Sequence, residues 1–133
     1  MSKRKARILM AKCGDGYEEA MLKLARSFSE AGYEVIYTDL QDPRAIVATA
    51  IQESVDHIGI TALPGAQIDF FSEMFNLLAK EDMTHIRVTA GGYLAENDVA
   101  KIKKMGVVEF FPKGTSHAQL IEWSKKNVEP VDS

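Results

Sequence analysis

The sequence has a single cysteine, no long apolar run and no excess of positive charge. Cys13 has no second cysteine with which to form an intrachain disulfide, and a lone thiol fits a reducing compartment, so we expect a cytoplasmic protein. No apolar stretch approaches the roughly 20 residues that span a bilayer. The N-terminus also lacks a hydrophobic segment with a small-residue cleavage site. We therefore expect neither a membrane partner nor an export signal.

The charge balance is slightly acidic, with a formal net charge of −3. One basic run, Lys3-Arg4-Lys5 with Arg7, precedes the first expected strand. Such a run is more typical of a solvated terminus than of a binding patch, so we expect no nucleic-acid partner. The 133 residues are 46% hydrophobic and 26% charged, with only four prolines and nine glycines. This composition and length predict one ordinary globular domain over residues 1–133.

Five short apolar segments alternate with five stretches of helical periodicity. The segments typical of strands are 7–11, 34–38, 57–61, 85–90 and 107–111. Asp42-Pro43 is typical of a helix start, Gly106 of a helix end, and Ser116 with Gln119 of a capping box. Strict alternation of strand and helix predicts a flavodoxin-like (Rossmann-like) α/β fold. We expect a doubly wound, five-stranded parallel sheet in the order 2-1-3-4-5.

In such a sheet, ligands bind beyond the carboxyl ends of the strands, near the point where the strand order reverses. This rule selects segments 13–17, 61–67, 90–93 and 112–116. All four are rich in Gly, Thr or Ser, which allow close approach of the backbone and offer hydroxyl groups. Loops of this kind also need such residues simply to turn. The four segments are therefore candidates for a site that further evidence must support.

The histidines and the cysteine offer no recognisable catalytic arrangement. His57 and His85 begin the third and fourth strands, so we expect them at the opposite edge of the sheet and on the surface. His117 begins the last helix and is expected to be an exposed polar residue. No cluster of His, Cys, Asp and Glu has metal-ligand spacing, and no Ser-His-Asp arrangement indicates nucleophilic catalysis. Cys13 has no neighbouring base, so we do not expect a catalytic thiol.

Four short motifs occur in order along these candidate segments. They are 11–20 (AKCGDGYEEA), 61–63 (TAL), 91–92 (GG) and 106–115 (GVVEFFPKGT). Together they resemble the cobalamin-binding domain of methylmalonyl-CoA mutase and related acyl-CoA mutases, over Arg7 to about Asn127. Each motif is weak alone, but four in the right order at the ligand edge indicate this family.

The resemblance implies a cofactor, a partner and a set of binding residues. The cofactor is cobalamin, in the form of adenosylcobalamin, with its corrin ring at the sheet edge and its nucleotide tail buried beside the sheet. The partner is a larger, barrel-type acyl-CoA mutase subunit that holds the substrate, so the chain alone should have no turnover. The implied cofactor-binding residues are Gly14, Asp15, Gly16, Tyr17, Ala20, Thr61, Leu63, Gly91, Gly92, Tyr93, Pro112, Gly114 and Thr115.

Two departures fall on the motif that carries the lower cobalt ligand in this family. Tyr17 stands in place of the ligating histidine, and Ala20 stands in place of a glycine. A neutral imidazole offers a lone pair near pH 7, whereas a phenol must first lose a proton with an ordinary pKa of about 10. The metal ligand is therefore unknown. Three outcomes are open: cobalamin bound with its own base on cobalt, cobalamin bound with water or nothing below, or no binding.

Two alternative functions are compatible with the same fold. The first is a cofactor-free or degenerate interaction module, in which Tyr17 fills a groove that no longer holds cobalamin. The second is a pseudo-receiver domain, because Thr89-Ala90 and Lys113 match residues of two-component receivers. Thr61, however, stands where a receiver carries its phosphorylatable aspartate. A flavodoxin is disfavoured because Asp15 would repel the phosphate, and a dinucleotide fold because the third motif glycine is missing.

Overall fold

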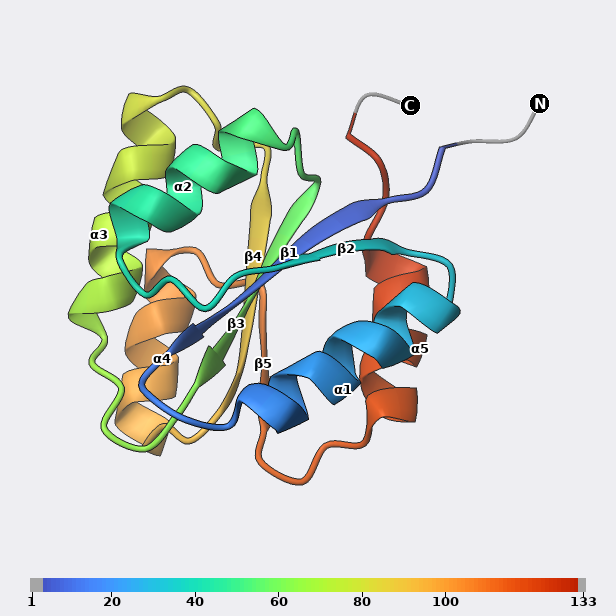
Figure 1. The fold of residues 1–133 in the computed structure, drawn as a ribbon. Helices are drawn as coiled ribbons and strands as arrows, with labels where there is room; N and C mark the ends of the chain where they lie inside the picture. Colours follow the sequence, from blue (N-terminus) through green and yellow to red (C-terminus); the bar gives the residue numbers. More distant parts are fainter. Residues whose placement is uncertain (1–3, 132–133) are drawn as a thin grey trace.

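The structure, a computed structural model, describes residues 4–131. Strands and helices alternate along the chain as the sequence predicts (Figure 1). The strands are β1 (Arg7–Cys13), β2 (Glu34–Tyr37), β3 (His57–Ala62), β4 (Arg87–Gly92) and β5 (Glu109–Pro112). The helices are α1 (Glu18–Glu30), α2 (Pro43–Gln52), α3 (Asp69–Lys80), α4 (Glu96–Met105) and α5 (His117–Asn127).

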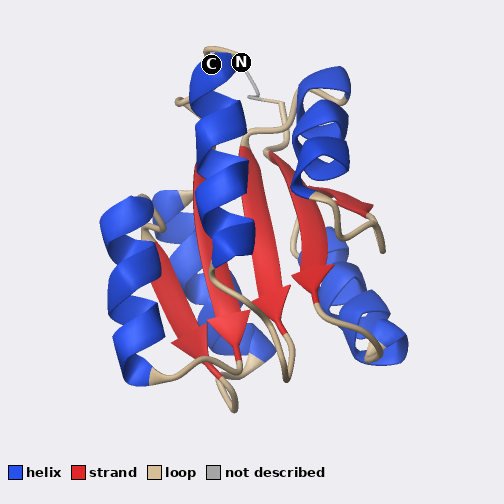
Figure 2. Cartoon of the chain, turned by 90° about the vertical axis from the view of Figure 1, so that its left-hand side faces the viewer, coloured by secondary structure: helices blue, strands red, loops and turns tan. Residues whose placement is uncertain are grey.

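The five strands form one parallel sheet in the order β2-β1-β3-β4-β5, which confirms the predicted fold. Helices α2, α3 and α4 cover one face of the sheet, and α1 and α5 cover the other (Figures 1 and 2). The reversal of strand order falls between β1 and β3, because the chain moves outward from β1 to β2 and then returns past β1. The carboxyl ends of the strands meet at one edge, where such a fold places its ligands.

Three strands differ from their predicted bounds by two residues at one or both ends. β1 continues to Cys13, and β4 begins at Arg87 and ends at Gly92, while β5 begins only at Glu109. Glycine is a poor strand former, so the apolar pattern in the sequence stops before Gly91, although the strand itself continues to Gly92. Register explains the extension, since Gly91 pairs with Thr61 of β3 and with Phe111 of β5. The paired glycine is therefore part of the sheet and not of the loop that follows it.

The predicted helix signals are confirmed. The Asp42 carboxylate accepts a hydrogen bond from the Arg44 amide at 3.0 Å and caps α2. Ser116 and Gln119 form the expected capping box at α5. Helix α4 ends at Met105, and its C-cap Gly106 has a φ of +136°, a conformation that favours glycine. Between residues 4 and 131, no helix combines the length and apolar character that a membrane span needs.

Arg4 and Lys5 of the basic N-terminal run are exposed, as the sequence predicts, but two arginines of the run also form ion pairs. Arg4 donates two hydrogen bonds to the buried carboxylate of Asp56, at 2.6 and 2.8 Å. Arg7 pairs with Glu34 at 2.8 Å, and its own amide donates to Asp56. Burial alone would raise the pKa of Asp56, but these hydrogen bonds, with one from the Val131 amide, hold that pKa below its usual value. Arg4 and Arg7 thus anchor the chain at the amino edge of the sheet. Lys3 lies outside the described residues.

Candidate functional site

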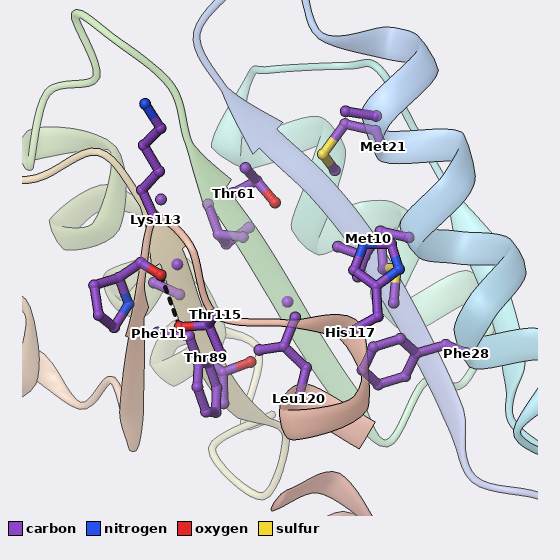
Figure 3. Close-up of a pocket in the computed structure, with 18 of the residues that line it drawn as sticks. Met10, Met21, Phe28, Thr61, Thr89, Phe111, Lys113, Thr115, His117 and Leu120 are labelled. Carbon is purple, nitrogen blue, oxygen red and sulfur yellow. Dashed lines mark hydrogen bonds between the residues drawn. The ribbon is translucent and has the colours of Figure 1, made fainter. Parts of the chain in front are cut away.

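A cavity of about 330 Å³ lies between the sheet and helices α1 and α5 (Figure 3). Its floor consists of alternate residues of three central strands, because successive side chains of a strand point to opposite faces. These floor residues are Ile8 and Met10 of β1, His57, Gly59 and Thr61 of β3, and Thr89 and Gly91 of β4. The cavity therefore extends along the strands from the carboxyl edge to their beginning.

The walls of the cavity are largely apolar. Met21, Leu24 and Phe28 of α1 form one wall, and Leu120 of α5 lies in the other. Gly59 leaves the middle of the floor open: a Cβ placed there would meet only the Thr89 hydroxyl, at 3.7 Å. A flat floor, apolar walls and a few hydroxyl groups suit a planar aromatic group.

The structure brings together most of the residues that the sequence selects. Those that line the cavity are Tyr17, Ala20, Thr61, Leu63, Gly91, Gly92, Tyr93, Pro112, Gly114 and Thr115. Gly14, Asp15 and Gly16 do not line it but form the loop that leads to Tyr17. The residue positions agree with the prediction, while their binding role stays a prediction.

Side chains fix this loop from two sides. Gln41 accepts a hydrogen bond from the Gly14 amide at 2.9 Å and donates one to Asp15 at 2.8 Å. Lys12, which is buried, donates to the Gly16 carbonyl at 2.8 Å and to Glu18 at 3.0 Å. The hydrogen bond with Glu18 raises the pKa of Lys12 and lowers that of Glu18. The loop is therefore held in place by the protein itself.

Tyr17 stands at the rim of the cavity. Its backbone is left-handed, with φ of 62°, and it forms the N-cap position of α1. The side chain is 48% exposed, and its ring lies 6.3 Å from the ring of Tyr93, whose face the Lys113 ammonium approaches to 4.9 Å. The cavity that Tyr17 lines has a volume of about 330 Å³. This geometry argues against a groove that Tyr17 has filled.

Backbone hydrogen bonds join the loops of the rim. The Leu63 amide donates to Cys13 at 2.9 Å, the Tyr93 amide donates to Ala62 at 2.8 Å, and the Lys113 amide donates to Gly92 at 3.2 Å. Gly91 permits the close approach of β4 to β5, because a Cβ at this position would lie 2.8 Å from the Phe111 carbonyl oxygen. The glycine pair thus serves strand packing as well as the floor of the cavity.

His57 is the main site residue that the sequence prediction misplaced. It is 4% exposed, and its Nε2 lies 2.9 Å from the Thr89 hydroxyl at the inner end of the cavity. Burial, and secondarily the charge of Arg87, lowers its pKa to about 4, so the imidazole is neutral at pH 7. The expected surface position was wrong. The sequence did contain a signal for this buried position. His57, Gly59 and Thr61 alternate along β3, so their side chains must lie on one face of the sheet.

The remaining histidines agree with the prediction. His85 is exposed and precedes β4, and His117 is exposed at the start of α5. The prediction did not include the hydrogen bond between His117 Nδ1 and the Ser27 hydroxyl, at 2.8 Å, which links α5 to α1 beside the cavity. Cys13 is buried, and burial raises the pKa of its thiol. Residues 4–131 contain no group of three or more His, Cys, Asp and Glu side chains that could hold a metal ion.

Comparison with known proteins identifies relatives of two lengths. A protein-family model described as "B12 binding domain" matches residues 8–121. The 2-hydroxyisobutanoyl-CoA mutase small subunit of Aquincola tertiaricarbonis is 37% identical, over 92% of this chain and 91% of that protein. The pivalyl-CoA mutase small subunit of Xanthobacter autotrophicus is 31% identical, over 90% and 81%. The methylmalonyl-CoA mutase large subunit of Propionibacterium freudenreichii subsp. shermanii is 30% identical, but this chain spans only 16% of it.

Solved structures match the fold at low sequence identity. A cobalamin-binding protein from Desulfitobacterium hafniense DCB-2 superposes with a TM-score of 0.72 and 20% identity, over 92% of this chain and 59% of that one. A response regulator from Thermotoga maritima superposes with a TM-score of 0.67 and 17% identity, over 92% and 96%. At these identities the likeness shows the fold alone, so receivers and cobalamin-binding proteins are equally good structural neighbours.

Proposed function

The chain belongs to the B12-binding domain family, and on that premise we propose that it is the cobalamin-carrying small subunit of a B12-dependent acyl-CoA mutase. The observation that carries the proposal is the cavity itself, an apolar slot that opens at the ligand edge between α1 and α5. The match of the chain to two mutase small subunits, over 91% and 81% of their lengths, supports the same function.

The residues present fit the cofactor. A corrin ring with its amide arms is far larger than a cavity of about 330 Å³, so Tyr17, Tyr93 and Thr115 at the rim would hold it. The nucleotide base is a flat aromatic group, and the slot over Gly59 and Gly91 would hold it. When bound, adenosylcobalamin supplies a cobalt–carbon bond whose homolysis starts the carbon-skeleton rearrangement.

In this proposal the protein contributes a fixed binding surface and a site from which water is excluded. The apolar walls would exclude water from the base, and the Thr61 hydroxyl, on the floor near the rim, would offer it a hydrogen bond. The loop that carries Tyr17 is fixed by Lys12 and Gln41 before any ligand arrives, so little conformational entropy is lost on binding.

The substrate belongs to the partner in this proposal. We propose a larger, barrel-type subunit that binds the acyl-CoA against the exposed face of the corrin, because the chain spans only a small part of a methylmalonyl-CoA mutase large subunit. We further propose a cytoplasmic location, which the single, reduced thiol of Cys13 suits. The alternative function, a pseudo-receiver domain, gains no support from Thr61, because threonine cannot replace the phosphorylatable aspartate of a receiver.

Two measurements test this function. After incubation with adenosylcobalamin and gel filtration, the protein should retain the cofactor's absorption near one equivalent; loss of all colour, with and without the partner, would contradict the proposal. The chain alone should not isomerise any acyl-CoA, whereas the chain with a large subunit recovered by pull-down from its host should do so. Turnover by the isolated chain would show that the small-subunit assignment is wrong.

A further inference from the structure

We infer that cobalamin bound to this chain carries water or nothing beneath its cobalt, with neither a nitrogen ligand nor a phenolate. The inference rests on the proposed function and goes beyond it, because it concerns the ligation state that the Tyr17 substitution leaves open. It follows from three observations: the cavity is open, the rim offers no suitable donor, and the histidines of the described chain lie elsewhere.

The open cavity favours displacement of the cofactor's own base from cobalt. The slot runs the length of the strands, from Thr61 at the rim to His57 and Thr89 at its inner end. If the base stayed on cobalt, this apolar space would remain in contact with water, at the usual cost for exposed apolar surface. If the base enters, its rings replace that water against Met10, Met21 and Leu120, which Figure 3 shows around one space.

The rim of the cavity lacks a neutral nitrogen donor. Besides the Thr61 hydroxyl, its polar side chains are those of Tyr17, Tyr93, Lys113 and Thr115. An ammonium group has no lone pair to offer a metal, and the Lys113 ammonium lies over the Tyr93 ring. A phenol ligates well only after losing its proton, and the half-exposed ring of Tyr17 lies beside another aromatic ring, that of Tyr93.

His57 and His117 line the cavity, but they lie too far from Tyr17. His57 precedes Thr61 by four strand residues, roughly 13 Å at about 3.3 Å per residue, and its Nε2 is engaged with Thr89. His117 is bonded to Ser27, which lies ten residues beyond Tyr17 and so roughly 15 Å along α1, at about 1.5 Å per residue. His85 is before β4, at the opposite edge of the sheet. None of them can replace the missing ligand at position 17.

Electron paramagnetic resonance of bound cob(II)alamin tests the inference directly. The nitrogen-15-labelled chain is loaded with unlabelled cob(II)alamin and freed of excess cofactor, alone and with its large subunit. We expect a spectrum without superhyperfine splitting from an axial nitrogen. A triplet from the cofactor's base, or a doublet from a labelled protein nitrogen, would overturn the inference and leave the proposed function intact. If neither preparation retained the cofactor, the inference and the proposed function would both be overturned.

Two substitutions at one position supply matched controls. Tyr17→Phe should leave the spectrum unchanged, because the phenol oxygen is not a ligand; a changed spectrum would overturn that part of the inference. Tyr17→His should add the doublet of a labelled protein nitrogen, and histidine also tolerates the left-handed backbone of this position better than tyrosine does. If the histidine variant binds cofactor without a doublet, position 17 does not lie beneath cobalt and the inference is wrong.

Discussion

The two faces of one sheet differ in how completely they are filled. On the face covered by α2, α3 and α4, Leu9, Ile58 and Val88 are fully buried and pack against Phe71 and other apolar side chains. On the face covered by α1 and α5, the intervening residues of the same strands border a cavity of about 330 Å³. The same backbone thus carries a close-packed core on one side and a binding slot on the other.

The difference arises from residue size at alternate positions. The filled face presents Ile58 and Ile60 from β3, whereas the hollow face presents His57, Gly59 and Thr61 from the same strand. A strand can therefore stabilise the domain with one set of side chains and leave room for a ligand with the other. Stability and binding should respond separately to substitutions on the two faces.

The largest expected difference concerns truncation of leucines on the two sides. Leu78→Ala removes a buried side chain of α3 on the filled face and should lower the free energy of unfolding by about 3 kcal/mol. Leu24→Ala removes a half-buried side chain beside a space that is already open and should cost about 1 kcal/mol. Urea denaturation of both variants measures the loss of unfolding free energy in each. Equal losses would show that the cavity is closed in solution.

The second prediction concerns pH and belongs to the hollow face alone. His57 has a folded-state pKa of about 4, below its unfolded value of about 6.5. The unfolded state therefore binds the proton first, and the contribution is full above about pH 6.5 and is lost as the pH falls toward 4. Relative to His57→Gln, the wild-type chain should lose roughly 2 kcal/mol of unfolding free energy between pH 7 and 5. Identical pH profiles for the two proteins would contradict the buried, neutral imidazole.

The third prediction separates binding from stability. Gly59→Leu fills the slot from its floor and should weaken cobalamin binding at least tenfold, about 1.4 kcal/mol, with little change in stability. Ala11→Leu, its counterpart on the filled face, forces extra volume into a close-packed core and should cost about 1–3 kcal/mol of stability. Cofactor titration and urea denaturation of the pair check this. If Gly59→Leu binds normally, the base does not enter the slot.

The smallest expected effects are those of removing a helix N-cap, and they should be equal on the two faces of the sheet. Ser116→Ala removes the N-cap of α5 on the hollow side, and Asp42→Ala removes that of α2 on the filled side. Each should cost about 1 kcal/mol, because exposed caps satisfy backbone amides and do not depend on the space beneath the helix. A much larger loss for Ser116→Ala in thermal melts would indicate that α5 depends on its cap to stay over the cavity.

The sequence predicts the fold and the rim well, because both follow from local signals. Strand order follows from strict alternation, and the rim loops carry recognisable residues such as Gly91, Tyr93 and Thr115. The floor is harder to predict, since Gly59, Thr89 and Met10 become neighbours only through strand register. His57 shows the limit most clearly: its place at a strand start suggested the surface, but helix α5 continues over that end of the sheet and brings Trp123 edge-on to its ring, 6.5 Å away. Side chains that cover a strand from a distant helix leave no local signal.

We propose that the hollow face, and not the filled one, receives the cofactor. Amide chemical shifts of the nitrogen-15-labelled chain, recorded with and without adenosylcobalamin, test this residue by residue. We expect shifts at Met10, Gly59, Thr89 and Leu120 together with the rim, and none in α2 and α3. Shifts confined to the rim, or centred on α2 and α3, would contradict it.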